Sequence, residues 1–170
     1  PRRSLAPPGP GPSMTSSRWP SITSLPSSSE AMDGLAELYG LLQEEDMWAG
    51  LWTKKAKYPE TNIAICYEQQ GFYEQAQGAY ELAMSKYRTD VATKPAPGSV
   101  MQEVRVWEEH WIRCSKELNQ WETLLEYGSS SSSPCLMTEA AWRVPGRWGV
   151  MKEALQQVEK AVSIDEGDIS

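Results

Sequence analysis

The stretch TNIAICYEQQGFYEQAQGAYELAMSKY, residues 61–87, determines the fold that we expect for the whole chain. Ile63, Tyr67 and Gly71 are spaced four apart, so they share one face of a helix. After Gly71 a second helical period places apolar or aromatic side chains at Phe72, Ala76, Ala79, Tyr80, Ala83 and Tyr87. Because glycine tolerates the left-handed conformation of a tight turn, the stretch predicts a helix hairpin around Gly71. The small alanines let the two helices approach, and Tyr80 fills the groove between them.

The composition excludes several classes of protein. The 170 residues carry 16 basic and 23 acidic side chains, a net charge of -7, and an acidic surface repels phosphate backbones. The apolar runs are too short for a transmembrane helix or a signal peptide. Three cysteines without a CxxC pair indicate an intracellular compartment. We therefore expect a soluble intracellular chain that binds neither nucleic acid directly nor a membrane.

Changes of composition along the chain predict a tail followed by four helix hairpins. Residues 1–30 are rich in Pro, Ser and Gly and are predicted to be disordered. Residues 31–162 carry helical periodicity, interrupted by polar loops near 88–99 and 128–135, and the acidic residues 163–170 are expected to fray. The fold class is all-α. Because the chain begins at Pro1 rather than methionine, we interpret it as a fragment of a longer protein.

Local signals place several helix ends and one long buried stripe. Asp33 is expected to cap the first helix, Pro59 to end the second, and Gly128 to end a helix that starts at Trp121. The most regular stripe alternates spacings of four and three through Val100, Val104, Trp107, Trp111, Cys114 and Leu118.

The four hairpins share a turn pattern that indicates an internal repeat. An aromatic residue opens each second helix, at Trp48, Tyr73, Trp121 and Trp148. The residues two positions earlier are types that tolerate turn geometry, namely Asp46, Gly71, Asn119 and Gly146. Units of this kind must stack to bury their apolar faces, so the series predicts an α-solenoid.

Two resemblances follow from these residues. The central hairpin is similar to a tetratricopeptide repeat at Tyr67, Gly71, Tyr73, Ala76, Tyr80 and Ala83. Over about residues 35–160, strings such as LLQEEDMWAGLW and WIRCSKELNQWE resemble the helical-repeat FAT region of the phosphatidylinositol 3-kinase-related family. Within that family, the chain most resembles a pseudokinase that scaffolds histone acetyltransferase complexes.

The second resemblance implies a non-catalytic scaffold that acts in transcription regulation and chromatin, in the nucleus. Its implied partners are other subunits of acetyltransferase coactivator complexes and transcription activators. It implies no cofactor, no metal and no small-molecule substrate.

Two alternatives to the scaffold remain open. The first is a free-standing tetratricopeptide-like adaptor, in which Lys54 and Lys55 hold an acidic peptide or its terminal carboxylate. The second is an enzyme based on His110, with Cys114 one helical turn away. That pair lacks the further ligands that zinc requires, and no phosphate-binding loop, kinase motif or GxSxG sequence is present. The sequence therefore predicts no catalytic residues.

Exposed tryptophans are a further candidate for contacts with partner proteins. Most of the tryptophans fall on periodic apolar faces and are expected in the core. Trp142, and either Trp107 or Trp111, are the best candidates for an interface.

Overall fold

The computed structural model describes residues 27–93 and 100–167, with only the backbone for 162–167. The regular structure in these ranges is entirely helical, which confirms the predicted all-α class. The helices are α1 (Ser28–Leu41), α2 (Glu45–Lys55), α3 (Pro59–Gln69), α4 (Tyr73–Thr93), α5 (Met101–Glu117), α6 (Trp121–Ser130), α7 (Pro134–Arg143) and α8 (Trp148–Gly167).

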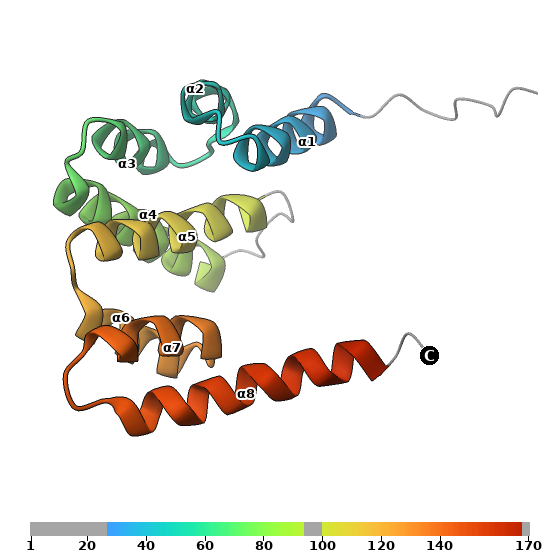
Figure 1. The fold of residues 1–170 in the computed structure, drawn as a ribbon. Coiled ribbons are helices and arrows are strands. Elements are labelled where there is room, and N and C mark those ends of the chain that lie inside the picture. Colours follow the sequence, from blue (N-terminus) through green and yellow to red (C-terminus); the bar gives the residue numbers. More distant parts are fainter. Residues whose placement is uncertain (1–26, 94–99, 168–170) are drawn as a thin grey trace, which may run out of the picture.

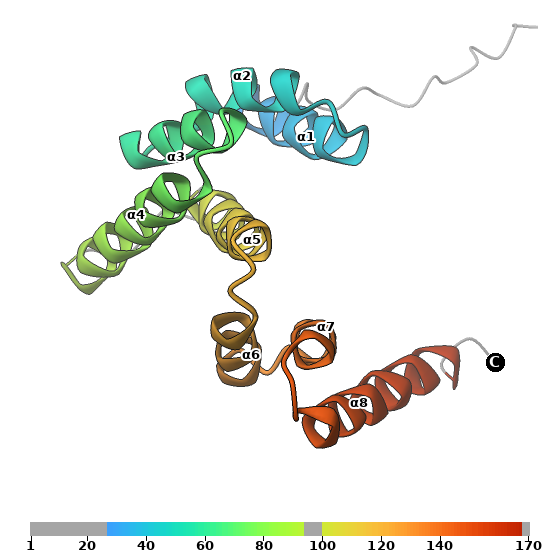
Figure 2. The same cartoon turned by 60° about the vertical axis from the view of Figure 1, so that its left-hand side comes forward.

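The helices stack in chain order into an open, curved solenoid (Figure 1). Each helix packs on its neighbour in the sequence, and α3 also contacts α5. Figure 2 shows α6, α7 and α8 extending away from the body formed by α1 to α5. Among the described helices, none combines the length and apolar composition needed to cross a lipid bilayer.

The turns between helices share one backbone feature. A residue with positive φ lies two positions before the first residue of the next helix at Gln43, Gly71, Asn119, Ser132 and Gly146. The predicted turn residues at 71, 119 and 146 are confirmed, but Asp46 is not one of them. Asp46 lies in the first turn of α2, where its carboxylate complements the helix dipole, and Gln43 makes the turn instead.

Several predicted helix ends lie elsewhere in the structure. Ser27 caps α1 through a capping box with Glu30, whereas Asp33 lies inside the helix and pairs with Lys55 at 2.7 Å. Pro59 begins α3 rather than ending α2, because its missing N–H costs nothing in the first helical turn.

The predicted loops and tails are also shorter than expected. Helix α4 continues to Thr93, α6 continues past Gly128 to Ser130, and α8 continues to Gly167. Helix α1 begins at Ser28, within the range that was predicted to be a tail, and residues 1–26, 94–99 and 168–170 lie outside the described residues.

The core runs through the middle of the stack and contains more polar groups than the sequence pattern indicated. Ala76, Tyr80 and Ala83 of α4 are fully buried. Ile63 and Tyr67 share one face of α3 as predicted, and that face is exposed. Its buried face is instead formed by Glu60, Thr61, Ala64, Ile65 and Glu68.

The turn at Gly71 provides a test of this architecture. Gly71 has φ of +76°, whereas Gly78 lies in the middle of α4 with no atom within 4 Å of an added Cβ. We expect Gly71→Ala to destabilise the chain by about 1–2 kcal/mol because an L side chain is strained there. Gly78→Ala should stabilise the chain by about 0.5–1 kcal/mol. Urea unfolding of both variants checks this pair, and equal effects of one sign would contradict the assigned turn.

Candidate functional site

The most concentrated set of polar contacts joins α5 to the start of α3. Glu103 of α5 is almost fully buried, and its carboxylate accepts hydrogen bonds from the backbone N–H groups of Lys57 and Tyr58 at 3.0 and 3.1 Å. It also accepts the Thr61 hydroxyl at 2.6 Å, and the Thr61 oxygen in turn accepts the Trp107 indole N–H at 2.7 Å.

This carboxylate supplies a helix cap that α3 lacks in its own sequence. Tyr58 occupies the N-cap position of α3 and provides no side-chain cap. The first N–H groups of a helix need acceptors, and the helix dipole favours a negative charge at that end. Glu103 places a carboxylate at that end from another helix and accepts the N–H of the N-cap residue Tyr58, together with that of the preceding Lys57. The start of α3 therefore depends on the position of α5.

A second buried carboxylate, Glu68, joins α3 to α4 and α5. Its Oε2 accepts the Tyr80 hydroxyl at 2.8 Å and lies 2.7 Å from His110 Nδ1, which donates because an ionised carboxylate only accepts. Its Oε1 lies 3.1 Å from Arg113 Nε, and the same guanidinium reaches Glu45 of α2 at 2.9 Å.

The network shifts the acidity of its members. Burial opposes ionisation of Glu68, but the hydrogen bonds from His110 and Tyr80 and the charges of His110 and Arg113 outweigh it and hold the Glu68 pKa below its usual range. Burial, reinforced by the Glu68 charge, raises the Tyr80 pKa. The site therefore contains an ionised carboxylate and a neutral phenol, fixed against each other.

A cleft of about 640 Å³ opens beside this network, between the α1–α2 turn, α3 and α5. Its walls include Tyr39, Gln43, Trp48, Glu68, His110 and Arg113. The His110 ring stacks on Trp48, with ring centres 4.5 Å apart. The imidazole and guanidinium lining the cleft are thus engaged with neighbouring side chains, and their contacts hold helices together.

The His110 and Cys114 pair has the geometry of packing rather than of catalysis. Cys114 is fully buried, and burial raises the pKa of its thiol to about 12, so the thiolate that a nucleophile needs is suppressed. His110 is committed to Glu68. In the parts of the chain that the structure describes, no group of three or more His, Cys, Asp or Glu side chains could hold a metal ion.

The predicted interface residues have different environments. Lys55 pairs with Asp33, hydrogen-bonds Gln102 and lies over the Trp52 ring, so it ties α2 to α1 and α5, while Lys54 is exposed. Trp107 is fully buried, and Trp111 is 9% exposed and donates its indole N–H to Glu81. Both tryptophans belong to the core and are unavailable to a partner, which corrects that part of the prediction.

Trp142, by contrast, is 63% exposed. The aromatic residues that open the second helices also differ, since Trp48, Tyr73 and Trp121 are half-buried while Trp148 is exposed.

The two carboxylates that organise the site were missed in the sequence although a signal was present. Glu103 lies three residues after Val100 and four before Trp107, so it falls on the buried stripe of α5. Glu68 likewise follows Ala64 and Ile65 at helical spacing. A charged residue on a buried stripe indicates a partner in another element.

The chain is similar in sequence to several known proteins. No protein-family profile matches it. Over 136 residues, 79% of the chain, it is 60% identical to the transformation/transcription domain-associated protein of Danio rerio and 58% identical to that of Homo sapiens. It is 42% identical over 130 residues, 76% of the chain, to the SAGA complex/NuA4 acetyltransferase complex subunit TRA1 of Saccharomyces cerevisiae.

The chain is homologous to a short segment of these transcription-associated proteins. It spans 3 to 4% of their lengths. The comparison confirms the resemblance predicted for about residues 35–160, and the relative concerned is the transformation/transcription domain-associated protein.

The Glu68 network makes stability depend on pH with a definite sign. A carboxyl whose pKa is lowered by folding contributes stability that is present above its unfolded pKa of about 4.3 and is lost as the pH falls through the folded pKa. We expect Glu68→Gln to cost about 2 kcal/mol at neutral pH and to flatten the loss of stability on acidification. Urea unfolding at several pH values measures this.

Glu109→Gln is the matched control, because Glu109 borders the same cleft on α5 but is exposed. If the free energy of unfolding falls equally on acidification in Glu68→Gln and in the unsubstituted chain, Glu68 is not ionised in the network as described.

Proposed function

We propose that this chain is a stretch of the helical scaffold of a nuclear transcription coactivator subunit, and that it acts without catalysis. The observation that carries the proposal is the 60% identity with a segment of a transformation/transcription domain-associated protein. The stacked architecture supports it, because helical-repeat proteins provide extended surfaces from units that contact only their neighbours.

The described polar groups support a structural role. The buried carboxylates of Glu103 and Glu68 accept bonds from several helices, and Gln77 of α4 bonds both Ser115 and Gln120. Each of these contacts fixes one helix relative to another. A scaffold requires this rigidity, since partners that bind at different places must keep a fixed geometry.

We infer that the partners are other subunits of acetyltransferase coactivator complexes and transcription activators. The relative from S. cerevisiae is named as a subunit of the SAGA and NuA4 complexes, and this chain would contribute one segment to such an assembly. The peptide-adaptor alternative loses its main anchor, because Lys55 is already paired with Asp33.

A replacement experiment in S. cerevisiae tests this proposal. The aligned segment of TRA1 is exchanged either for this chain or for a flexible linker of equal length, and the SAGA and NuA4 subunits that co-purify are quantified. We expect this chain to restore both complexes and the linker to reduce them, because the helical stack sets the spacing of the flanking regions.

The same chimaera with Glu103→Ala should recover less complex than with Glu109→Ala, an exposed position on the same helix. Recovery of both complexes at full yield with the flexible linker would contradict a scaffold role for this segment.

A further inference from the structure

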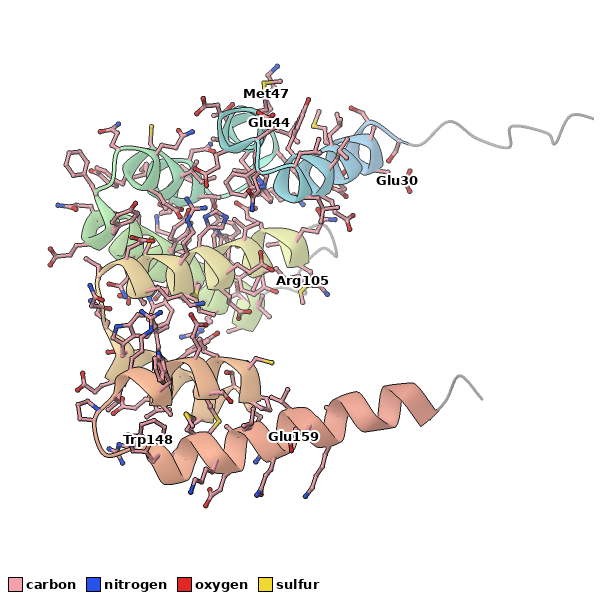
Figure 3. The ribbon with its side chains drawn as sticks, in the orientation of Figure 1. Glu30, Glu44, Met47, Arg105, Trp148 and Glu159 are labelled. Atoms are coloured by element: carbon pink, nitrogen blue, oxygen red, sulfur yellow. The ribbon has the colours of Figure 1, made fainter. Side chains whose placement is uncertain are left out.

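The first two helices present an acidic surface with exposed leucines. Residues 27–53 contain six acidic side chains and no lysine or arginine. Leu41 and Leu42 are 77% and 59% exposed at the end of α1 and just beyond it. The acidic leucine face is defined here as Glu37, Leu38, Leu41, Leu42, Glu44 and Met47, all of which are exposed. Figure 3 shows Met47 pointing outward from α2, and Glu44 is the N-cap residue of that helix.

The last hairpin carries the opposite combination. Residues 140–152 contain no acidic side chain and three basic ones, in a chain with an excess of acid. Trp142 and Trp148 are 63% and 58% exposed and meet edge to face with ring centres 6.5 Å apart. The tryptophan tip is defined here as Trp142, Arg143, Arg147, Trp148 and Lys152, all exposed.

The two surfaces match in charge and in apolar character. The tip carries cations where the acidic leucine face carries carboxylates, and each surface exposes large apolar side chains, indoles on the tip and leucines on the face. Large aromatic residues and arginine are the side chains that contribute most binding energy at interfaces. Complementary potentials also favour the correct docking register.

We propose that two copies of this chain associate head to tail, with the tryptophan tip of one seated on the acidic leucine face of the next. The two surfaces lie at opposite ends of the stack (Figures 1 and 3), so they cannot meet within one chain. An interface between different surfaces is heterologous and adds copies in series. This association is independent of the proposed function.

The number of basic side chains on the tryptophan tip favours a second copy of this chain as its partner over a lipid surface or a nucleic acid. Recognition of anionic lipids uses clusters of about four to eight basic residues, and duplex DNA is bound through about six to ten phosphate contacts. The tip supplies three cations, and the rest of the chain is acidic. A small acidic protein surface with apolar side chains matches the tip better, and the chain itself carries one.

Paired charge reversals test the proposal directly. Arg147→Glu with Lys152→Glu makes the tip acidic and leaves Arg143 over the Trp121 ring, 4.1 Å from its centre. Glu37→Lys with Glu44→Lys makes the leucine face basic. Sedimentation velocity of the full chain from micromolar to millimolar concentration measures association, and circular dichroism checks that each variant is folded.

We expect the unsubstituted chain to gain mass with concentration, and to do so less at high salt. Each reversed variant alone should associate more than about tenfold more weakly, because its two surfaces then carry the same sign of charge. An equimolar mixture of the two variants should regain association, since each then meets a complementary surface only on the other.

Arg88→Glu with Arg105→Glu is the matched control for the tip variant, because it makes the same change in net charge as Arg147→Glu with Lys152→Glu, at exposed positions on α4 and α5 (Arg105 is labelled in Figure 3). Its association should equal that of the unsubstituted chain. A chain that stays monomeric throughout, reversals that leave association unchanged, or a mixture that fails to regain it would each overturn the proposal. So would binding of the tip to anionic vesicles or DNA in preference to a second copy.

Discussion

The buried carboxylate of Glu103 is the contact on which the rest of the structure depends. It accepts two backbone N–H groups and a threonine hydroxyl at the start of α3, and it comes from a helix that lies more than forty residues later in the chain. A buried charge without partners is strongly unfavourable, so these donors and the helix dipole must remain aligned with it. The contact therefore fixes α3 against α5 in one register.

The neighbouring contacts extend this constraint through the stack. Glu68 lies one helical turn after Ala64 on the buried face of α3. Its carboxylate contacts Tyr80 of α4 and His110 of α5. Arg113 of α5 pairs with Glu68 and also with Glu45 of α2. Buried polar contacts of this kind add little net stability compared with apolar packing, but a mispaired arrangement leaves a charge unsatisfied. The solenoid thus gains a defined geometry between successive hairpins, which is the property that a scaffold needs.

Periodicity in the sequence was sufficient for the helices and for much of the core, because the α5 stripe and the alanines of α4 bury apolar side chains in the ordinary way. It failed where burial is polar. The spacing of Ile63 and Tyr67 marks one face of α3, yet the buried face is a different one. It carries Thr61 and Glu68, whose partners lie on other helices. The cap from Glu103 could not be found from local sequence for the same reason. The turn at Asn119, by contrast, was predicted correctly, because the preference of asparagine for turn geometry is a local property of the sequence.

The most direct test of this account is the free energy of unfolding of Glu103→Ala and Glu103→Gln, combined with Thr61→Val in a double-mutant cycle. Removal of the carboxylate is predicted to cost about 3 kcal/mol, and Glu103→Gln with Thr61→Val to show a coupling energy of about 1–2 kcal/mol. Glu109→Ala, exposed on the same helix, should stay within about 0.5 kcal/mol of the unsubstituted chain. A Glu103→Ala chain as stable as the Glu109→Ala chain, with no coupling to Thr61, would contradict the claim that this carboxylate fixes the stack.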